Sequence, residues 1–132
     1  MNVTADTNML IRAAVQDDLH QARRAMKVLA EADLVAVPVP VVCEFVWVFR
    51  RGYKKSAADV SDAVRRLMSS ANVVMNRTAV EAGLSALDAD GDFADGVIAY
   101  EGEWLGAEEF VSFDSKAVSL LQAQGGRARL LS

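Results

Sequence analysis

The chain has 132 residues, of which 18 are acidic and 14 basic, so its formal net charge is −4. This length fits one domain, and because phosphate backbones are held mainly by Lys and Arg, the excess of acids does not suggest a nucleic-acid binder. The single cysteine, Cys43, and the single histidine, His20, exclude an internal disulfide, a four-ligand Cys/His zinc site and catalysis by a pair of histidines.

The first half of the chain alternates short apolar segments with amphipathic ones. Apolar residues spaced three and four apart predict helices, and short β-branched or apolar runs predict strands. Pro38 and Pro40 end one strand and open a helix, and Ser56 begins another helix with a capping signal. The expected elements are a strand at 2–6, helices at 9–15 and 20–31, a strand at 34–37, helices at 41–51 and 56–68, and a weak strand at 72–75.

The second half continues this alternation around a turn rich in Gly and Asp at 88–92. Its expected elements are helices at 78–87 and 93–105, a strand at 109–113, a helix at 116–124 and a last strand at 128–131. Strands that alternate with helices predict an α/β fold. We expect a single domain over residues 1–132, with a central parallel β-sheet of four to five strands flanked by helices.

The charges are segregated along the chain. Residues 50–66 carry six bases and two acids, a net charge of +4, whereas residues 81–114 carry ten acids and no base. The acidic segment is interleaved with apolar residues that are typical of a core, which a disordered tail would lack. An ordered acidic segment of this kind indicates either a bound cation or a solvated acidic face.

Four acids lie where an apolar α/β domain has little structural need for them. Asp6 and Asp114 follow predicted strands, and ligands of open parallel sheets bind at the carboxyl ends of strands, although either residue could instead be a helix N-cap. Glu44 interrupts the apolar helical run VVCEFVWVF, and Asp95 lies near the start of a helix, three residues after Asp92. Crowded carboxylates raise one another's pKa unless a divalent cation binds, and ligand sets made only of oxygen select Mg²⁺ or Mn²⁺.

These motifs resemble those of PIN-domain proteins, and more narrowly those of the VapC toxins of bacterial and archaeal VapBC toxin–antitoxin pairs. The resemblance rests on Ala5-Asp6-Thr7-Asn8, on Glu44, on the segment from Asp92 to Ala99 and on Ser112-Phe113-Asp114, and it covers the whole chain. It implies a PIN domain that acts as a Mg²⁺- or Mn²⁺-dependent endoribonuclease and hydrolyses RNA phosphodiester bonds.

The resemblance also implies roles for individual residues. The catalytic and metal-binding residues would be Asp6, Glu44, Asp95 and Asp114, with Asp92 as an accessory acid and Thr7, Asn8 and Ser112 shaping the site. Asp95 is preferred to Asp92 as the inner ligand because Asp-x-x-Ile-Ala is the part that matches the family best. Candidate RNA contacts are Arg12, Arg50, Arg51, Lys54 and Lys55, although the last four could equally be a solvated helix end and Arg12 could pair with an antitoxin.

The partners implied by the resemblance are an RNA substrate, a cognate VapB-type antitoxin and a second copy of the chain. The antitoxin's C-terminal segment would cover the acidic groove, and a homodimer would join it in a heterotetramer or a larger assembly. Apolar surface on the helices at 41–49 and 56–68 suits these contacts, and Trp47 and Phe49 are expected to pack in the core or against a partner rather than on bases. Neither a leader nor an apolar run of roughly 20 residues stands out, so we expect a cytoplasmic protein with no membrane association.

Two other functions fit part of the pattern. A phosphoacceptor receiver domain also gathers acids at strand ends, but it has adjacent acids after its first strand and a Lys after its fifth. Here Asp6 stands alone, and no Lys follows Leu131. The second alternative is a PIN fold that has lost its activity and serves only as a binding module, and the presence of all four acids argues against it.

Overall fold

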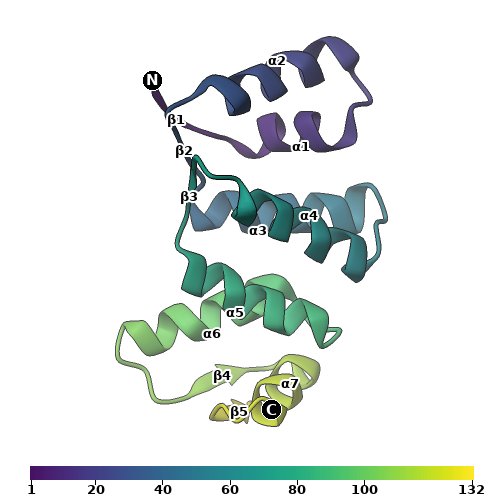
Figure 1. Ribbon diagram of the computed structural model, residues 1–132. Helices are drawn as coiled ribbons and strands as arrows, with labels where there is room; N and C mark the ends of the chain where they lie inside the picture. The colour runs from purple at the N-terminus through teal and green to yellow at the C-terminus, as the bar shows by residue number, and fades with distance from the viewer. The chain divides into compact units, whose positions relative to one another are not determined.

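The computed structural model describes all residues from 1 to 132, and it contains five strands, seven α-helices and one π-helical segment. Figure 1 shows the alternation of strands and helices along the chain. The chain divides into two compact units, Met1–Asn76 and Arg77–Ser132.

The first unit is built on a parallel three-stranded sheet in the order β1-β2-β3. Its strands are β1 (Asn2–Thr4), β2 (Leu34–Ala36) and β3 (Val73–Val74). Val3 lies opposite Val35, and Val35 lies opposite Val73. Val35 is buried, as is Val37 directly after the strand, so β2 is the central strand in burial as well as in order.

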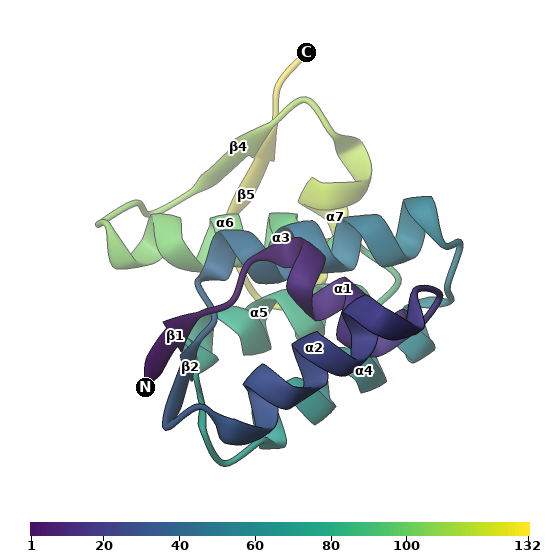
Figure 2. The same ribbon diagram turned by 90° about the horizontal axis from the view of Figure 1, so that it is seen from above.

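Helices connect these strands, so the first unit has the strand–helix–strand form that parallel pairing requires. They are α1 (Thr7–Val15), α2 (Leu19–Glu31), α3 (Val39–Trp47), the π-helix η1 (Val48–Gly52) and α4 (Ala57–Ser69). Asp6, Asp18 and Ser56 each accept a hydrogen bond from the backbone N–H three residues further on, which defines where α1, α2 and α4 begin. Figures 1 and 2 both show α1 beside α2. The expected capping signal at Ser56 is confirmed.

The helix expected at 41–51 is confirmed in part, because its last turn is not α-helical. The backbone N–H of Tyr53 donates to the carbonyl oxygen of Val48, the spacing of a π-helix, at 3.1 Å. The rings of Phe45, Phe49 and Tyr53 contact one another along this segment. The Phe45–Phe49 pair is tilted, with ring centroids 4.5 Å apart, and the Phe49–Tyr53 pair is edge-to-face, with centroids 5.9 Å apart. This aromatic packing accompanies the change in helical spacing.

The second unit is dominated by a close pair of helices. Its elements are α5 (Arg77–Asp88), α6 (Phe93–Trp104), β4 (Phe110–Ser112), α7 (Ser115–Ala123) and β5 (Ala128–Leu130). A Cβ atom on Gly96 of α6 would lie 2.5 Å from the carbonyl oxygen of Ala82 in α5, so only glycine permits this approach. The backbone of α6, including its first turn, is therefore held tightly against α5.

The expected single central sheet of four to five strands is not confirmed. All five strands are parallel, as expected, but β4 pairs only with β5, and the strands form one sheet of three and another of two. β1 and β4 are each an edge strand of their own sheet. The strands are two or three residues long, so few hydrogen bonds join each pair.

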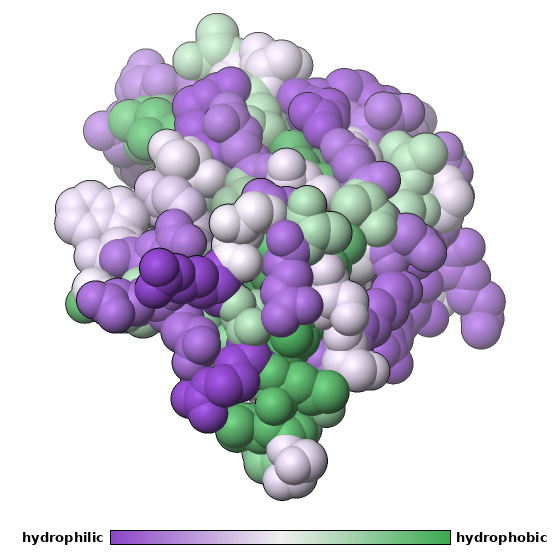
Figure 3. Space-filling view, turned by 90° about the horizontal axis from the view of Figure 1, so that it is seen from below, coloured by the Kyte–Doolittle hydropathy of each residue, from purple (hydrophilic) through white to green (hydrophobic).

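None of the helices combines the length and the apolar character that crossing a membrane requires. The face of the surface drawn in Figure 3 is largely hydrophilic, with one strongly hydrophobic group of side chains at its lower end. In the second unit, Val111, Phe113 and Leu130 are among the exposed apolar residues.

Candidate functional site

Asp6 is placed at the junction of β1 and α1. Its Oδ1 accepts a hydrogen bond from the backbone N–H of Met9 at 2.9 Å, so the side chain caps α1, while Oδ2 makes no hydrogen bond within the protein. Thr7 and Asn8 form the first turn of the same helix. Capping was the structural alternative for Asp6, and the geometry shows that capping occupies only one of its two oxygens.

Glu44 lies on α3, in the same unit as Asp6, and α3 packs against α1. Its neighbours Phe45 and Val46 are buried, whereas Glu44 itself is exposed. The helical period thus turns the carboxylate to solvent and the flanking apolar side chains to the core. The apolar run VVCEFVWVF suggested that Glu44 would be buried at a cost in folding free energy. Because Glu44 is exposed, it does not carry that cost.

Three acids of the second unit interact with one another. Asp92 is the N-cap of α6, where its Oδ1 accepts from the backbone N–H of Ala94 at 2.7 Å. Asp95 follows in the first turn of α6, and Asp114 is the N-cap of α7. Unlike the side chains of the two capping acids, the side chain of Asp95 makes no hydrogen bond within the protein.

Burial raises the pKa of the Asp95 carboxyl above its ordinary value, and the negative charges of Asp92 and Asp114 raise this pKa further. The first turn of a helix favours a negative charge, which would lower the pKa. Burial and the two carboxylates outweigh that effect. Asp95 is therefore a partly buried carboxylate beside two others, and no hydrogen bond to its side chain offsets its charge.

Asp114 is fixed by its own hydrogen bonds. Its Oδ1 accepts from the backbone N–H groups of Lys116 and Ala117, at 3.0 and 3.2 Å, and its backbone N–H donates to Ser112 Oγ at 2.9 Å. Ser112 thus contacts the residue that the resemblance expected it to support. As in Asp6 and Asp92, the second carboxylate oxygen stays without a hydrogen bond.

These carboxylates suit a hard divalent cation by their chemistry. Within neither unit do three side chains of His, Cys, Asp or Glu already converge into a metal site. In the second unit, however, the donors are carboxylate oxygens only, the Oδ2 atoms of Asp92 and Asp114 make no hydrogen bond, and burial together with these two carboxylates raises the pKa of Asp95. Oxygen donors with excess negative charge fit Mg²⁺ or Mn²⁺.

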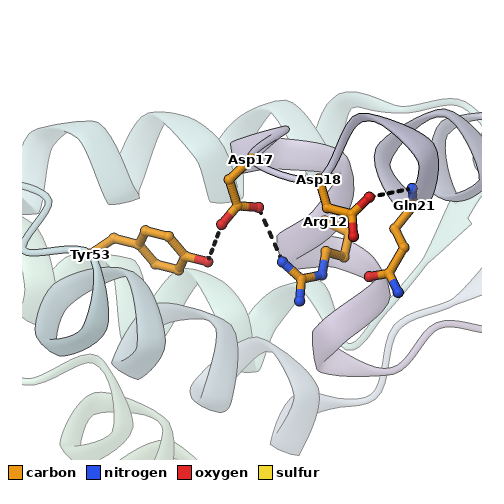
Figure 4. A network of polar contacts seen from close by, with 5 residues as sticks. All are labelled: Arg12, Asp17, Asp18, Gln21 and Tyr53. Carbon is orange, nitrogen blue, oxygen red and sulfur yellow. Dashed lines mark hydrogen bonds and ion pairs between the residues drawn. The ribbon is translucent and has the colours of Figure 1, made fainter.

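The candidate RNA contacts of the first unit differ in how far their charges are already engaged. Figure 4 shows Arg12 pointing toward Asp17, whose Oδ1 accepts from Arg12 Nη1 at 3.1 Å and whose Oδ2 accepts from the Tyr53 hydroxyl at 3.3 Å. Asp18 caps α2 beside this network. Sequence reasoning missed Asp17 and Tyr53, because 36 residues separate them and neither belongs to a motif.

The remaining candidates are exposed. Arg50 Nη1 donates to the carbonyl oxygen of Lys55 at 3.0 Å, whereas Arg51 and Lys54 form no hydrogen bond or ion pair. Trp47 was expected to be buried in the core or against a partner, and 60% of it is exposed within the chain, whereas Phe49 is buried.

The first unit also contains a pocket of about 700 Å³. Its lining mixes apolar residues with the charged Lys55, Asp59 and Arg66, and most of it comes from α1, α2, α3, η1 and α4. Lining residues include Leu10, Ala14, Met26, Leu29, Phe45 and Leu67. Sequence periodicity predicted apolar faces on these helices but not the hollow between them.

A comparison with protein families relates this arrangement to a known fold. A model of the PIN domain matches residues 3–119, which include parts of both units. No curated protein matches the chain. PIN domains are generally a nuclease fold and typically depend on Mg²⁺ or Mn²⁺. Because the match covers most of the sequence and includes every acid discussed above, the chain belongs to the PIN-domain family.

Proposed function

We propose that this protein is a metal-dependent endoribonuclease. The observation that carries the proposal is the cluster Asp92–Asp95–Asp114, where burial and two neighbouring carboxylates raise the pKa of Asp95 in a chain of the PIN-domain family. Helix capping accounts for Asp92 and Asp114, but Asp95 caps no helix and its side chain accepts no hydrogen bond. A site for a divalent cation accounts for its position.

Asp6, Glu44, Asp95 and Asp114 would hold Mg²⁺ or Mn²⁺, with Asp92 as an accessory acid. A bound divalent ion supplies positive charge that stabilises the phosphodiester transition state and lowers the pKa of a water molecule. The chain's own part is to fix the carboxylates in advance: the helix N-termini orient Asp6 and Asp114, and Ser112 holds the backbone of Asp114. Thr7 and Asn8 shape the first turn of α1 beside Asp6.

The direct test is cleavage of single-stranded RNA with and without Mg²⁺ or Mn²⁺. Asp95→Asn should lower kcat/KM at least about 100-fold, as loss of a group that acts in the transition state commonly does. Asp90→Asn is the matched control, because Asp90 is an exposed acid in the adjacent turn with φ +66, a conformation that Asn tolerates. Full activity of Asp95→Asn, or activity that survives a chelator, would contradict the proposal. Inactivity of the natural chain with both metals would favour the binding-module alternative.

We further propose that the protein is the toxin of a VapBC-type pair, that an antitoxin segment covers the pocket of the first unit, and that the toxin acts as a homodimer. The apolar part of the lining and the volume of about 700 Å³ suit a few inserted apolar side chains. Ala14 lines this pocket and is exposed, so Ala14→Glu should leave the fold and the cleavage of RNA unchanged.

The antitoxin proposal is tested with the product of a short reading frame next to the gene. Expression of the chain alone should arrest growth, and co-expression of this product should relieve the arrest. Ala14→Glu should weaken the complex at least about tenfold, because it places a charge against apolar side chains. Unchanged binding by Ala14→Glu would exclude this pocket as the docking site.

A further inference from the structure

Trp47 is a large aromatic side chain that the fold leaves in solvent. It is the last residue of α3, and 60% of it is exposed, whereas Phe45, Val46 and Phe49 on either side are buried. The indole is thus directed away from the core of the first unit while its neighbours anchor the helix. An exposed tryptophan held on an anchored helix offers a rigid flat surface to a ligand.

The residues around Trp47 carry the charges that an RNA strand would meet. Glu44, a proposed metal-binding residue, lies three positions earlier on the same helix, which places it about 5–6 Å away between Cβ atoms. Arg51 lies four positions later, one turn further along η1. All three side chains are exposed and follow one another at the spacing of neighbours on a helix, and we call them the Trp47 stripe.

The π-helix supports this arrangement by separating the roles of two adjacent arginines. Arg50 is engaged, since it donates to the carbonyl oxygen of Lys55. The side chain of Arg51 forms no hydrogen bond or ion pair within the protein, and it is exposed. A free guanidinium one turn from an exposed indole can hold a phosphate while the indole contacts the attached base.

We infer that Trp47 stacks on an unpaired base of the RNA substrate while Arg51 binds a neighbouring phosphate, next to the carboxylate of Glu44. This inference rests on the proposed ribonuclease function and names its substrate class as single-stranded RNA. Stacking on an indole requires an unstacked, unpaired base, and it tolerates any base because each has a π-face. The Trp47 stripe therefore distinguishes single-stranded from double-stranded RNA and does not distinguish one base sequence from another.

A second copy of the chain is the other occupant to weigh for Trp47. The core of a protein–protein interface is depleted of charged residues, whereas the Trp47 stripe carries a carboxylate and a guanidinium on either side of the indole. An indole with a guanidinium one turn away suits a nucleic-acid strand better than a homodimer core, because the indole can stack on a base while the guanidinium binds a phosphate. Burial of Trp47 in a homodimer would overturn the inference.

The chain has two tryptophans, so fluorescence can report on each one separately. Trp104→Phe leaves Trp47 as the single indole, and Trp47→Phe leaves Trp104, which is also exposed. Both variants are made in the Asp95→Asn background so that RNA is bound without being cleaved. Titration with single-stranded oligouridine should quench Trp47 emission saturably, while a duplex of equal length quenches it far less and Trp104 stays unaffected. Equal quenching of both indoles, or none at Trp47, would overturn the inference.

Cleavage kinetics give the second readout, in the otherwise natural chain. Trp47→Leu should raise KM for single-stranded RNA by about 5- to 150-fold with kcat nearly unchanged, the effect of losing one base stack. Trp47→Phe should restore most of the affinity, and Trp104→Leu is the control. An unchanged KM in Trp47→Leu, or emission of Trp47 that shifts to the blue as protein concentration rises, would overturn the inference. If the natural chain cleaves no RNA, the proposed function fails, whereas the quenching titration still tests stacking by itself.

Discussion

Asp95 lies in the first turn of α6, partly buried, with Asp92 and Asp114 as charged neighbours. Its raised pKa means that the folded chain binds a proton at Asp95 more readily than the unfolded chain does. The stability that this proton contributes is fully present below the ordinary pKa of 3.8 and is lost as pH rises through the raised value. At neutral pH without metal, the charged Asp95 therefore opposes folding.

Asp95→Asn removes that charge and should stabilise the metal-free protein at pH 7 by up to about 1 kcal/mol, the size expected for a half-exposed charge interaction. The gain should shrink as pH falls toward 3.8, because the natural carboxyl is then neutral as well. Thermal unfolding in the presence of a chelator, at neutral and acid pH, measures both values. A variant that is less stable than the natural chain at pH 7 would show that Asp95 has a structural role.

Capping could be predicted at some residues and the network of Figure 4 could not. Asp6, Ser56 and Asp114 carry their signal within three residues of chain, and the hydrogen bonds are found there. The contact of Asp17 with Tyr53 depends on how the α1–α2 connection meets the end of η1. No local pattern encodes that meeting. For the same reason the sequence did not decide between the core and a partner for Trp47, and the structure excludes the core.

At the scale of elements, the close packing of α5 on α6 positions two of the proposed acidic residues. Gly96→Ala should destabilise the protein by about 1–3 kcal/mol, because the new Cβ would lie 2.5 Å from a backbone oxygen of α5, which cannot move aside cheaply. Thermal or denaturant unfolding measures the loss. Part of the RNA cleavage should be lost as well, since Asp92 and Asp95 belong to the displaced turn.

Gly102→Ala, in the same helix, is the matched control. Its new Cβ would meet nothing closer than 4.0 Å, and alanine is the better helix former. This variant should be stabilised by up to about 1 kcal/mol and should keep its activity. Equal destabilisation of both variants would indicate that α6 tolerates no alanine for reasons other than contact with α5.

The elements themselves were largely predictable, and the pairing of the strands was not. Periodicity placed every helix within two residues of its observed start, but the π-helical turn at 48–52 has no signature in an apolar run. The strand expected at 72–75 is reduced to Val73–Val74. Runs this short encode little about which strand they will pair with, so the sequence suggested one sheet where the structure has two.

At the scale of the whole molecule, the net charge of −4 conceals a basic and an acidic segment, one in each unit. The basic segment at 50–66 lies in the first unit and the acidic segment at 81–114 in the second. The family match spans parts of both units. The acid excess that first argued against a nucleic-acid enzyme is concentrated where the proposed metal ligands lie.

Divalent metal should therefore stabilise the whole chain against unfolding. A ligand at a hundredfold excess over its Kd, bound only by the folded state, adds about 2.7 kcal/mol. Mg²⁺ or Mn²⁺ should raise the Tm of the natural protein, and K⁺ at equal ionic strength should not. Asp95→Asn should lose most of this shift. If both proteins respond equally to Mg²⁺, the ion acts by general screening and not at the acidic cluster.

Two of the proposed ligands, Asp6 and Asp114, cap helices, and this has a consequence for how such a protein can change over time. Asn and Ser cap a helix about as well as Asp does, so replacing Asp6 or Asp114 by either would remove a carboxylate ligand of the cation while preserving the start of its helix. Selection for folding does not act against this replacement, because the helix cap is kept. Only selection for catalysis acts against it. A single substitution can therefore convert a protein of this fold into a stable relative that has lost its catalytic activity but keeps its binding surfaces and its partners.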